Sequence, residues 1–388
     1  MSSLRWTTAG ESHGPALVGV IEGFPAGFPL DSARIDAELA RRQGGYGRGG
    51  RMRIETDRAQ ILSGMRAGLT LGSPIALSLV NKDATIERLP VPTNARPGHA
   101  DLAGCLKLGV RDPRAVLERA SARETAMRVA LGGVARQLLE HFGVEICGHV
   151  VALAEVDVDE RAADAAFDGS APDRNARRSA SEFYALDPTF DVRAKAIVDA
   201  AKEAGDTLGG LFEVRVLGLP PGLGSYQSGP ERLTARLGGA LFSIPAMKGV
   251  EFGLGFETAR RRGSEAHDAI EAAPGGTGPS GTRYRRATNR SGGLEGGLTT
   301  GAPLVVRVAM KPIPTLRRGL PTVDFETLEG VAATWQRSDV TSVPAASVVG
   351  EAVIALELAR AFLDKFGGDT LSEIERAQAA YLRAARDV

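Results

Sequence analysis

The sequence predicts a single domain of mixed helices and strands that is built from two related halves. Apolar runs typical of buried strands alternate with helical patterns along the 388 residues, and no Pro/Ser-rich linker separates them. The segment SGMRAGLTLGSP at 63–74 resembles GGLEGGLTTGAP at 292–303, and LGGVARQLLEHFGVE at 131–145 resembles LGGALFSIPAMKGVE at 237–251. The alignment of the first pair continues to Lys82 in one segment and Lys311 in the other. Chance similarity is the alternative for each pair, but together they predict nested halves that share a site.

The first half is expected to begin with a buried strand at 16–21. A helix capped by Asp31 or Ser32 follows and ends at Gly44-Gly45. Strands at 51–57 and 71–80 and a proline-bearing loop at 89–100 come next. Asp112-Pro113 then opens the longest helical pattern, which runs to Phe142. Gly132-Gly133 inside this pattern predicts close packing against a neighbouring element.

The second half is expected to contain strands at 144–153, 211–217 and 302–310, with a helix at 192–204. A Pro/Gly turn at 220–224, a glycine-rich stretch at 275–301 and a stiff KPIPT loop at 311–315 connect them. An amphipathic helix at 346–366 and one further helix end the chain. Residues 155–190 are polar and acidic, and we expect them to form an irregular surface insertion within one domain spanning 1–388.

Composition limits the class of protein. Hydrophobic residues make up 43% and charged residues 24% of the chain, as in ordinary globular proteins. Net charge is zero, although 40 arginines stand against 7 lysines, which favours small anionic ligands over nucleic acid. Cys105 and Cys147 form no C-x-x-C motif, so we expect a reducing compartment and no structural zinc. The absence of an apolar leader or a long apolar run predicts a cytoplasmic protein without a membrane span.

The stretch at 41–53, RRQGGYGRGGRMR, combines five arginines with five glycines. Glycine permits close backbone approach, and arginine offers a permanent charge whose planar fork matches phosphate and carboxylate oxygens. This pattern predicts a loop that clamps a polyanion. An RNA-binding RGG patch is the alternative, but such tracts usually repeat and this one occurs once.

Ser12 and His13 lie in GESHG at 10–14, which matches the G-x-S-x-G pattern of serine hydrolases. That motif needs a strand before the serine and a helix after it, whereas Pro15 and a strand-like run follow here. We therefore interpret the match as accidental. His13 lies among glycines and remains a candidate for proton transfer near neutral pH.

A second histidine, His99, follows the rigid turn Arg96-Pro97-Gly98 and precedes Asp101. Asp101 or another acid could fix its tautomer, while a structural loop histidine is the equal alternative. The remaining histidines lack the spacing of metal ligands, and no protein-bound metal is predicted.

Further candidates lie in the two halves. Arg119 and Arg123 are expected to share one face of the long helix beside Ser121 and Glu124. The G-x-G-x-x-G match at 276–281 fails as a dinucleotide fingerprint because no strand precedes it. Asp339 beside Arg337 is a candidate general base, with a surface ion pair as the alternative.

Taken together, these segments resemble the chorismate synthase family. The resemblance rests on motifs in the family's order: GESHGPAL at 10–17, RRQGGYGRGGRM at 41–52, RPGHAD at 96–101, ERASARET at 118–125, GVEFG at 249–253, GGLEGG at 292–297, KPIPT at 311–315 and QRSDV at 336–340. It implies an α+β fold, a β-α-β sandwich of two pseudo-symmetric halves, assembled as a homotetramer. It further implies 1,4-anti elimination of phosphate from 5-enolpyruvylshikimate-3-phosphate to give chorismate, with reduced FMN that undergoes no net oxidation.

The resemblance also assigns residues. His13 would protonate the departing phosphate, His99 would set the protonation of flavin N1, and Asp339 would assist flavin N5 as the C6 hydrogen leaves. The substrate site would comprise Ser12, Arg42, Arg48, Arg51, Arg96 and Arg337. The FMN site would comprise Arg42, Arg48, Arg119, Ala120, Ser121, Pro245, Ala246, Gly296, Lys311, Pro312, Ile313, Pro314, Thr315 and Arg337.

One departure from the family pattern affects the FMN site. Many members have Asn-Ala where this chain has Pro245-Ala246, and proline offers neither a backbone donor nor a side-chain amide. NADPH as the source of reduced flavin is left open by the sequence. The competing classes are an RNA-binding module, a serine hydrolase that depends on Ser12, and a symmetric scaffold with incidental arginines.

Overall fold

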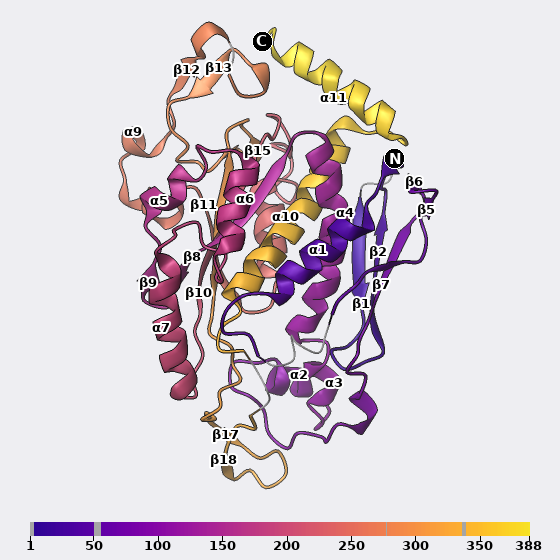
Figure 1. The fold of residues 1–388 in the computed structure, drawn as a ribbon, viewed down its shortest axis with the longest axis vertical. Coiled ribbons are helices and arrows are strands. Elements are labelled where there is room, and N and C mark those ends of the chain that lie inside the picture. The colour runs from indigo at the N-terminus through magenta and orange to yellow at the C-terminus, as the bar shows by residue number, and fades with distance from the viewer. Residues whose placement is uncertain (1–3, 50–55, 277, 336–338) are drawn as a thin grey trace.

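The computed structural model describes residues 4–49, 56–276, 278–335 and 339–388. Two antiparallel sheets enclose a central layer of helices (Figure 1). The N-terminal sheet has the strand order β1-β2-β7-β4, at Arg5–Ala9, Ala16–Glu22, Ile75–Val80 and Gln60–Ile61. The C-terminal sheet has the order β11-β16-β10-β8-β9, at Met247–Phe252, Leu304–Met310, Gly210–Leu217, Glu145–Leu153 and Val156–Asp157. The α+β class and the β-α-β sandwich are confirmed.

Three helices form most of the central layer: α1 at Ser32–Gln43, α4 at Thr125–His141 and α10 at Val343–Phe366. Helix α4 packs against β2 and β7, α10 packs against β8 and β10, and the two helices contact each other. Gly132 permits this contact, because a Cβ there would lie 2.5 Å from the Cβ of Ala352. The predicted close packing is confirmed at Gly132. Helix α10 is buried on nearly all sides because it lies between layers, so its predicted amphipathic character is wrong.

The strands follow from alternating side chains. In β7, Ile75, Leu77 and Leu79 are fully buried against the helices, while the residues between them face outward. The strand expected at 71–80 is interrupted, because Gly72 to Pro74 turn the chain between β6 (Leu69–Leu71) and β7. The strand expected at 51–57 lies mostly outside the described residues.

Both halves repeat one order of elements. The first runs β1, β2, α1, β4, a hairpin of β5 (Met65–Arg66) and β6, β7 and α4. The second runs β8, β10, α8 (Leu233–Phe242), β11, a hairpin of β14 (Leu294–Glu295) and β15 (Leu298–Thr299), β16 and α10. The similarity between 63–74 and 292–303 therefore marks equivalent hairpins. The similarity between 131–145 and 237–251 links α4 of the first half with α8 of the second half, which are not equivalent elements. The two halves therefore follow each other in tandem, and the predicted nested order is wrong.

The long helix expected from 112 to 142 is broken. The chain forms α3 at Arg114–Leu117, a 3₁₀ turn at Ala122–Glu124 and then α4. Ser121 has an extended backbone, with ψ of 144°, and its side chain accepts a hydrogen bond from the amide of Arg123. Serine competes for backbone hydrogen bonds in this way at helix starts, which explains the break.

Residues 155–190 contain helices, so their expected irregularity is wrong, while the insertion itself stays a prediction. They contain α5 (Glu160–Ala165) and α6 (Ala171–Ala180) and lead into α7 (Phe190–Glu203). Phe183 and Leu186 are fully buried, and Arg178 forms an ion pair with Glu351 of α10 at 2.7 Å. These contacts tie the segment to the central layer. The single-domain organisation stays a prediction.

The remaining elements lie in the connections: β3 at Ala26–Pro29, α2 at Asp101–Leu108, α9 at Gly263–Ala266, β12 at Ile270–Ala272, β13 at Tyr284–Arg286, β17 at Pro321–Val323, β18 at Gly330–Ala332 and α11 at Leu371–Ala385. Helices α2 and α3 and the hairpin β17–β18 gather at one end of the sandwich, the lower end in Figure 1. Within the described part of the chain, we find no helix with the length and apolar character that crossing a bilayer requires.

Candidate functional site

His13 lies between β1 and β2 and is held by a buried carboxylate. Its Nδ1 lies 2.8 Å from Oε2 of Glu118, and its backbone amide donates to the same oxygen at 3.0 Å. On the other edge of the ring, Nε2 lies 3.8 Å from Oδ2 of Asp83. Burial alone would raise the pKa of Glu118, but hydrogen bonds from His13 and Arg114 outweigh it and lower that pKa.

The break between α3 and α4 brings Ser121 to the same place. Ser121 Oγ donates to Oγ of Ser12 at 3.2 Å, and the Ser12 amide donates to the carbonyl of Glu118 at 3.1 Å. Because β1 and β2 form a hairpin around Ser12, the strand–turn–helix context of a hydrolase serine is absent here. Nearby, Arg119 donates to the carbonyls of Thr8 and Gly10 from an exposed position.

Arg119 and Arg123 do not share a face, so that prediction is wrong. Arg123 is buried and forms an ion pair with Asp57 at 2.7 Å, while Arg119 is 43% exposed and donates to Thr8 and Gly10 at the end of β1. The interrupted helix changes the angle between the two positions. Arg123 therefore supports the interior of the site, and Arg119 lies at its edge.

Arg42 at the end of α1 is a buried cation. Its Nε donates to Thr125 Oγ1 at 3.0 Å and its Nη2 donates to the carbonyl of Ala122 at 2.8 Å. Its Nη1 is buried and has no hydrogen-bond partner among the residues that the structure describes. Burial and the nearby charges of Arg48 and Arg123 lower the pKa of Arg42 to about 9. An anion placed here would relieve an unfavourable positive charge.

The loop after α1 is joined to the segment before α10 through Asp339. Arg48 Nη1 lies 2.7 Å from Oδ2 of Asp339, and the amide of Gly49 donates to Oδ1 at 2.6 Å. Ser342 adds a hydrogen bond to Oδ2 at 2.7 Å. Asp339 thus fixes one end of the arginine–glycine loop. Two further predicted anion-binding residues, Arg51 and Arg337, lie outside the described residues.

His99 has the same kind of support as His13. Its Nδ1 lies 2.5 Å from Oδ1 of Asp101, and Arg96 binds both oxygens of that carboxylate at 2.7 and 3.0 Å. Burial would raise the pKa of Asp101, but hydrogen bonds from His99 and Arg96 hold it well below its usual range. Asp101 therefore holds the His99 ring, which is the arrangement expected if an acid fixes the tautomer of this histidine.

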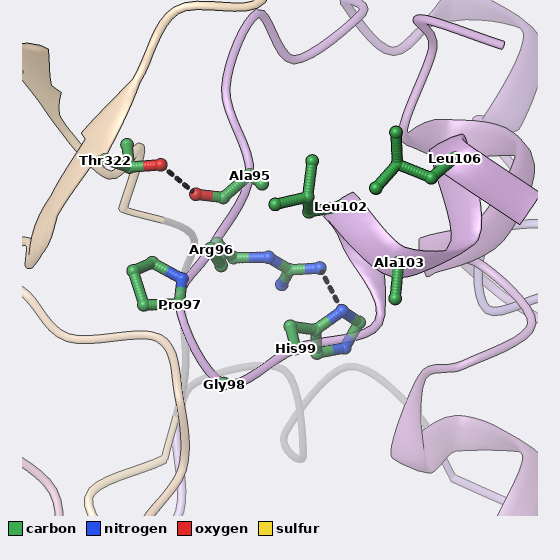
Figure 2. Close-up of a pocket in the computed structure, with 9 residues that line it drawn as sticks. All are labelled: Ala95, Arg96, Pro97, Gly98, His99, Leu102, Ala103, Leu106 and Thr322. Atoms are coloured by element: carbon green, nitrogen blue, oxygen red, sulfur yellow. Dashed lines mark hydrogen bonds between the residues drawn. The ribbon is translucent and has the colours of Figure 1, made fainter.

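Figure 2 shows His99 and Arg96 at an open pocket of about 430 Å³, lined otherwise by Ala95, Pro97, Gly98, Leu102, Ala103, Leu106 and Thr322. Leu102 and Leu106 project from α2 toward the pocket, opposite the polar side chains of the loop. The arrangement offers one apolar wall and one polar wall. Such a lining suits a flat ligand that carries a charged group.

The KPIPT loop lies beside this pocket. Arg96 Nη1 donates to Thr315 Oγ1 at 3.4 Å, and Nζ of Lys311 donates to the carbonyl of Gly98. The amide of Lys311 donates to the carbonyl of Ala246 at 3.0 Å, which places Pro245-Ala246 at the same end of β16. Burial and the charge of Lys248 lower the pKa of Lys311.

Backbone contacts join these groups into one region. Arg42 reaches the carbonyl of Ala122, next to Ser121, and the Val340 amide donates to Gly47 at 2.8 Å. The Leu208 amide donates in turn to Val340 at 2.8 Å, and Thr207 binds the carbonyl of Ile313. The predicted histidines, the arginines at 42, 48 and 96, Asp339 and the KPIPT loop therefore meet at one end of the sandwich.

Gly296 does not join this region within one chain. It lies in the exposed turn between β14 and β15, which precedes β16, whereas Lys311 follows the far end of that strand. Seven residues of strand span roughly 20 Å. In Figure 1, β15 lies toward the upper end of the molecule, away from α2 and α3.

Glu118, Arg114, Asp57 and Thr125 are site residues that sequence reasoning did not select. Glu118 and Arg114 lie four residues apart on a predicted helix, the spacing of an ordinary ion pair, and are 2.7 Å apart. The same spacing occurs in many exposed helices, so it gave no reason to select them. Among the described residues, no group of three or more potential ligands could hold a metal ion.

Comparisons with known proteins agree with the position of these motifs. The family model described as chorismate synthase matches residues 4–363. The chain is 52% identical to a chorismate synthase of Desulforudis audaxviator, with 99% of this chain and 98% of that protein covered. It is 51% identical to one of Trichlorobacter lovleyi, over 99% and 100% of the two chains. A solved crystal structure of chorismate synthase superposes with a TM-score of 0.81 at 42% identity, covering 100% of this chain and 99% of that one. The chain therefore belongs to the chorismate synthase family of lyases.

Proposed function

We propose that this protein converts 5-enolpyruvylshikimate-3-phosphate into chorismate and inorganic phosphate by 1,4-anti elimination, with reduced FMN as cofactor. The observation that supports this proposal most directly is the buried guanidinium of Arg42. Arg42 is only 4% exposed, its Nη1 has no hydrogen-bond partner among the described residues, and its pKa is lowered to about 9. A buried cation of this kind favours an anionic ligand. The proposed substrate carries one phosphate and two carboxylates, and FMN carries another phosphate.

The residues fit both anionic groups. Arg42, Arg48 and Arg96, with Ser12 beside them, would hold the substrate. Arg119, Ala120, Ser121, Ala246 and the loop at 311–315 would hold FMN. Arg51, Arg337, Pro245 and Gly296 stay predictions from family position. When bound, reduced FMN supplies an electron-rich ring beside the carbon skeleton.

The chain's own residues would handle protons. His13 would donate from Nε2 to the departing phosphate, since its Nδ1 faces Glu118. His99 would present Nε2 toward the flavin N1 edge, because its Nδ1 faces Asp101. Asp339 would take part in removal of the C6 hydrogen while it keeps Arg48 in place. Arginine side chains around the leaving phosphate would stabilise the charge that develops there.

The test is an anaerobic assay with 5-enolpyruvylshikimate-3-phosphate and dithionite-reduced FMN, which follows chorismate absorbance and released phosphate together. We expect equal amounts of both, and neither product when FMN stays oxidised. A folded preparation that releases no phosphate would refute the proposal. A parallel reaction with oxidised FMN and NADPH shows whether the protein reduces its own flavin.

RNA binding is the weaker candidate. Arg42 is buried, the side chain of Arg48 is only 10% exposed, and both contact other residues of the chain, whereas an RNA backbone needs exposed cations. The same assay separates the two, since RNA binding would show steep salt dependence and no flavin requirement.

We further propose a homotetramer in the cytoplasm. Val18 and Val80 are exposed on the outer face of the N-terminal sheet, while the outward His149 of the C-terminal sheet is buried beside Phe167. An uncovered sheet face suits contact with a second copy. Cys105 and Cys147 are both free thiols, as in reducing compartments. Light scattering after gel filtration, which measures the mass directly, tests the assembly, and cell fractionation tests the location.

A further inference from the structure

We infer that Glu118 is a positioning residue that keeps a hydrogen on Nδ1 of His13 and leaves Nε2 as the atom for proton transfer. The inference rests on the proposed function in one respect, the role of His13 toward the departing phosphate. The tautomer itself is independent of that role and can be measured without substrate or flavin.

Glu118 binds the dipeptide Ser12-His13 at three points. Its carbonyl accepts the amide of Ser12 at 3.1 Å, and its Oε2 accepts the amide of His13 at 3.0 Å. The same Oε2 lies 2.8 Å from Nδ1 of the His13 ring. The backbone and the ring of His13 are therefore both oriented by one side chain.

The ionisation of Glu118 decides which nitrogen carries the hydrogen. Its side chain is only 2% exposed, yet hydrogen bonds from His13 and Arg114 lower its pKa and keep it ionised near neutral pH. An ionised carboxylate only accepts hydrogen bonds. Nδ1 must therefore carry a hydrogen, and in the neutral ring Nε2 is the unprotonated nitrogen.

Arg114 keeps the carboxylate in this orientation. Its Nη1 binds Oε1 of Glu118 at 2.7 Å, while its Nη2 donates to the carbonyl of Pro90 at 2.7 Å. Each oxygen of Glu118 thus has its own partner, Arg114 on one side and His13 on the other. Asp83 also faces His13, since its Oδ2 lies 3.8 Å from Nε2.

The broken helix makes the Ser12 contact possible. In an uninterrupted helix the carbonyl of Glu118 would accept the amide of residue 122. The extended backbone of Ser121 removes that bond, and the Ser12 amide takes its place. The break therefore couples the helix to the loop that carries His13.

The second histidine also has a carboxylate at Nδ1, but its arginine lies differently. His99 Nδ1 lies 2.5 Å from Oδ1 of Asp101, while Nη2 of Arg96 binds the same Oδ1 at 3.0 Å and lies 3.1 Å from that Nδ1. At His13, Arg114 binds the other oxygen of Glu118, so Oε2 is left to the ring and the amide of His13. The fixed tautomer is therefore inferred for His13 from Glu118 alone.

The direct test is ¹⁵N NMR of protein labelled at its five histidines, recorded without ligands at a pH where the rings are neutral. The His13 signals are assigned by their loss in His13→Ala. We expect a protonated Nδ1 and an unprotonated Nε2 in the wild type. A wild-type ring with its hydrogen on Nε2 overturns the inference, whatever the variants do.

The variant Glu118→Gln should reverse this tautomer. Its amide oxygen would turn to the charged donor Arg114, because charge-assisted hydrogen bonds are the stronger ones. Its NH₂ would then face Nδ1, and the His13 amide would lose its acceptor. The matched control is Glu124→Gln, which removes another buried carboxylate that pairs with an arginine four residues away, Arg128. The control should leave the His13 signals unchanged. An unchanged tautomer in folded Glu118→Gln overturns the inference.

Kinetics separate this inference from the proposed function. Glu118→Gln should lower kcat about 100-fold with KM near the wild-type value, because general acid–base catalysis contributes that much. In a His13→Ala background it should lower kcat little further, since both changes remove one function. Full additivity would overturn the inference. If His13→Ala turns over normally, the proton-donor role fails, and the NMR result still decides the role of Glu118.

Discussion

Burial divides the arginines of the 41–53 stretch into different roles. Arg41 forms ion pairs with Glu38 and Glu351 inside the protein, whereas Arg48 pairs with Asp339. Among the described residues Arg42 forms no ion pair, unlike Arg41 and Arg48, and burial together with the charges of Arg48 and Arg123 lowers its pKa to about 9. The stretch as a whole predicts anion binding, but the contacts show that its members differ. The clearest candidate for the anion is Arg42.

Arg42→Lys should weaken binding of 5-enolpyruvylshikimate-3-phosphate about tenfold, because an ammonium point charge cannot keep the planar contacts with Thr125 and the Ala122 carbonyl while it presents a donor where Nη1 lies. Calorimetric titration of the folded variant measures the change. Arg34→Lys is the matched control on the same helix, where an exposed arginine pairs with Glu140, and its affinity should equal that of the wild type. Equal affinity in Arg42→Lys would contradict the assignment.

Asp339→Asn should preserve FMN binding and slow turnover by about 100-fold, the usual contribution of a positioned acid or base. An amide oxygen can still accept the hydrogen bond from Gly49, but the ion pair with Arg48 is lost. Flavin fluorescence titration and single-turnover rates measure the two effects. If the variant fails to fold, Asp339 is structural.

At the scale of elements, packing decides where helices break and where they touch. Charge spacing predicted one long helix with Arg119 and Arg123 on a common face, yet Ser121 interrupts it and buries only Arg123. The local bond between Ser121 and the Arg123 amide favours a break, but many serines occur inside helices; the contacts with Ser12, more than a hundred residues away in sequence, add what local propensity does not contain. The glycine pair in α4 was predictable, since glycine inside a helix usually has a packing reason.

Gly132→Ala should destabilise the protein by about 1–3 kcal/mol, the usual range for overpacking. A Cβ there would lie 2.6 Å from the Cα and 2.8 Å from the carbonyl oxygen of Ala352, so backbone must move. The control is Gly239→Ala in α8, where no atom lies within 4 Å and alanine should stabilise the helix by up to about 1 kcal/mol. Urea denaturation of both variants measures the difference. A Gly132 variant as stable as the wild type would contradict the packing account.

At the scale of the whole molecule, Glu351 joins the two halves. Its carboxylate contacts Arg41 of α1, Arg136 of α4 and Arg178 of α6 at 2.7–3.0 Å. Burial alone would raise the pKa of Glu351, but the three arginines hold it well below its usual range. Removing this charge leaves three buried cations around it.

Glu351→Gln should therefore reduce the free energy of unfolding by about 3–5 kcal/mol, as for other broken buried ion pairs. Glu375→Gln removes an exposed partner of His141 and should change it by less than about 1 kcal/mol. Urea denaturation at neutral pH compares the two variants. Similar small effects in both would show that the buried network contributes little.

Stability should fall in acid. The pKa values of Asp101, Glu213 and Glu351 are lowered in the folded protein, so these carboxyls bind protons more weakly than in the unfolded chain. Their contribution is complete above the unfolded pKa values, about 4, and is lost as the pH falls from there toward the folded values. Urea midpoints between pH 7 and pH 3 should decrease, and less steeply in Glu351→Gln. A constant midpoint would contradict the lowered pKa values.

The sequence by itself determined the family, the alternating strands and the capped helix α1, and it supplied the candidate site residues, because these depend on local periodicity and on motifs in a fixed order. The tandem order of the halves, the broken helix and the partners of each charge were decided by the tertiary structure. Glu118 and His13 lie 105 residues apart, and only the packing of α3 against the β1–β2 hairpin brings them together. Whether a charged residue becomes a ligand, a support or a surface group depends on burial and neighbours, which local sequence does not specify.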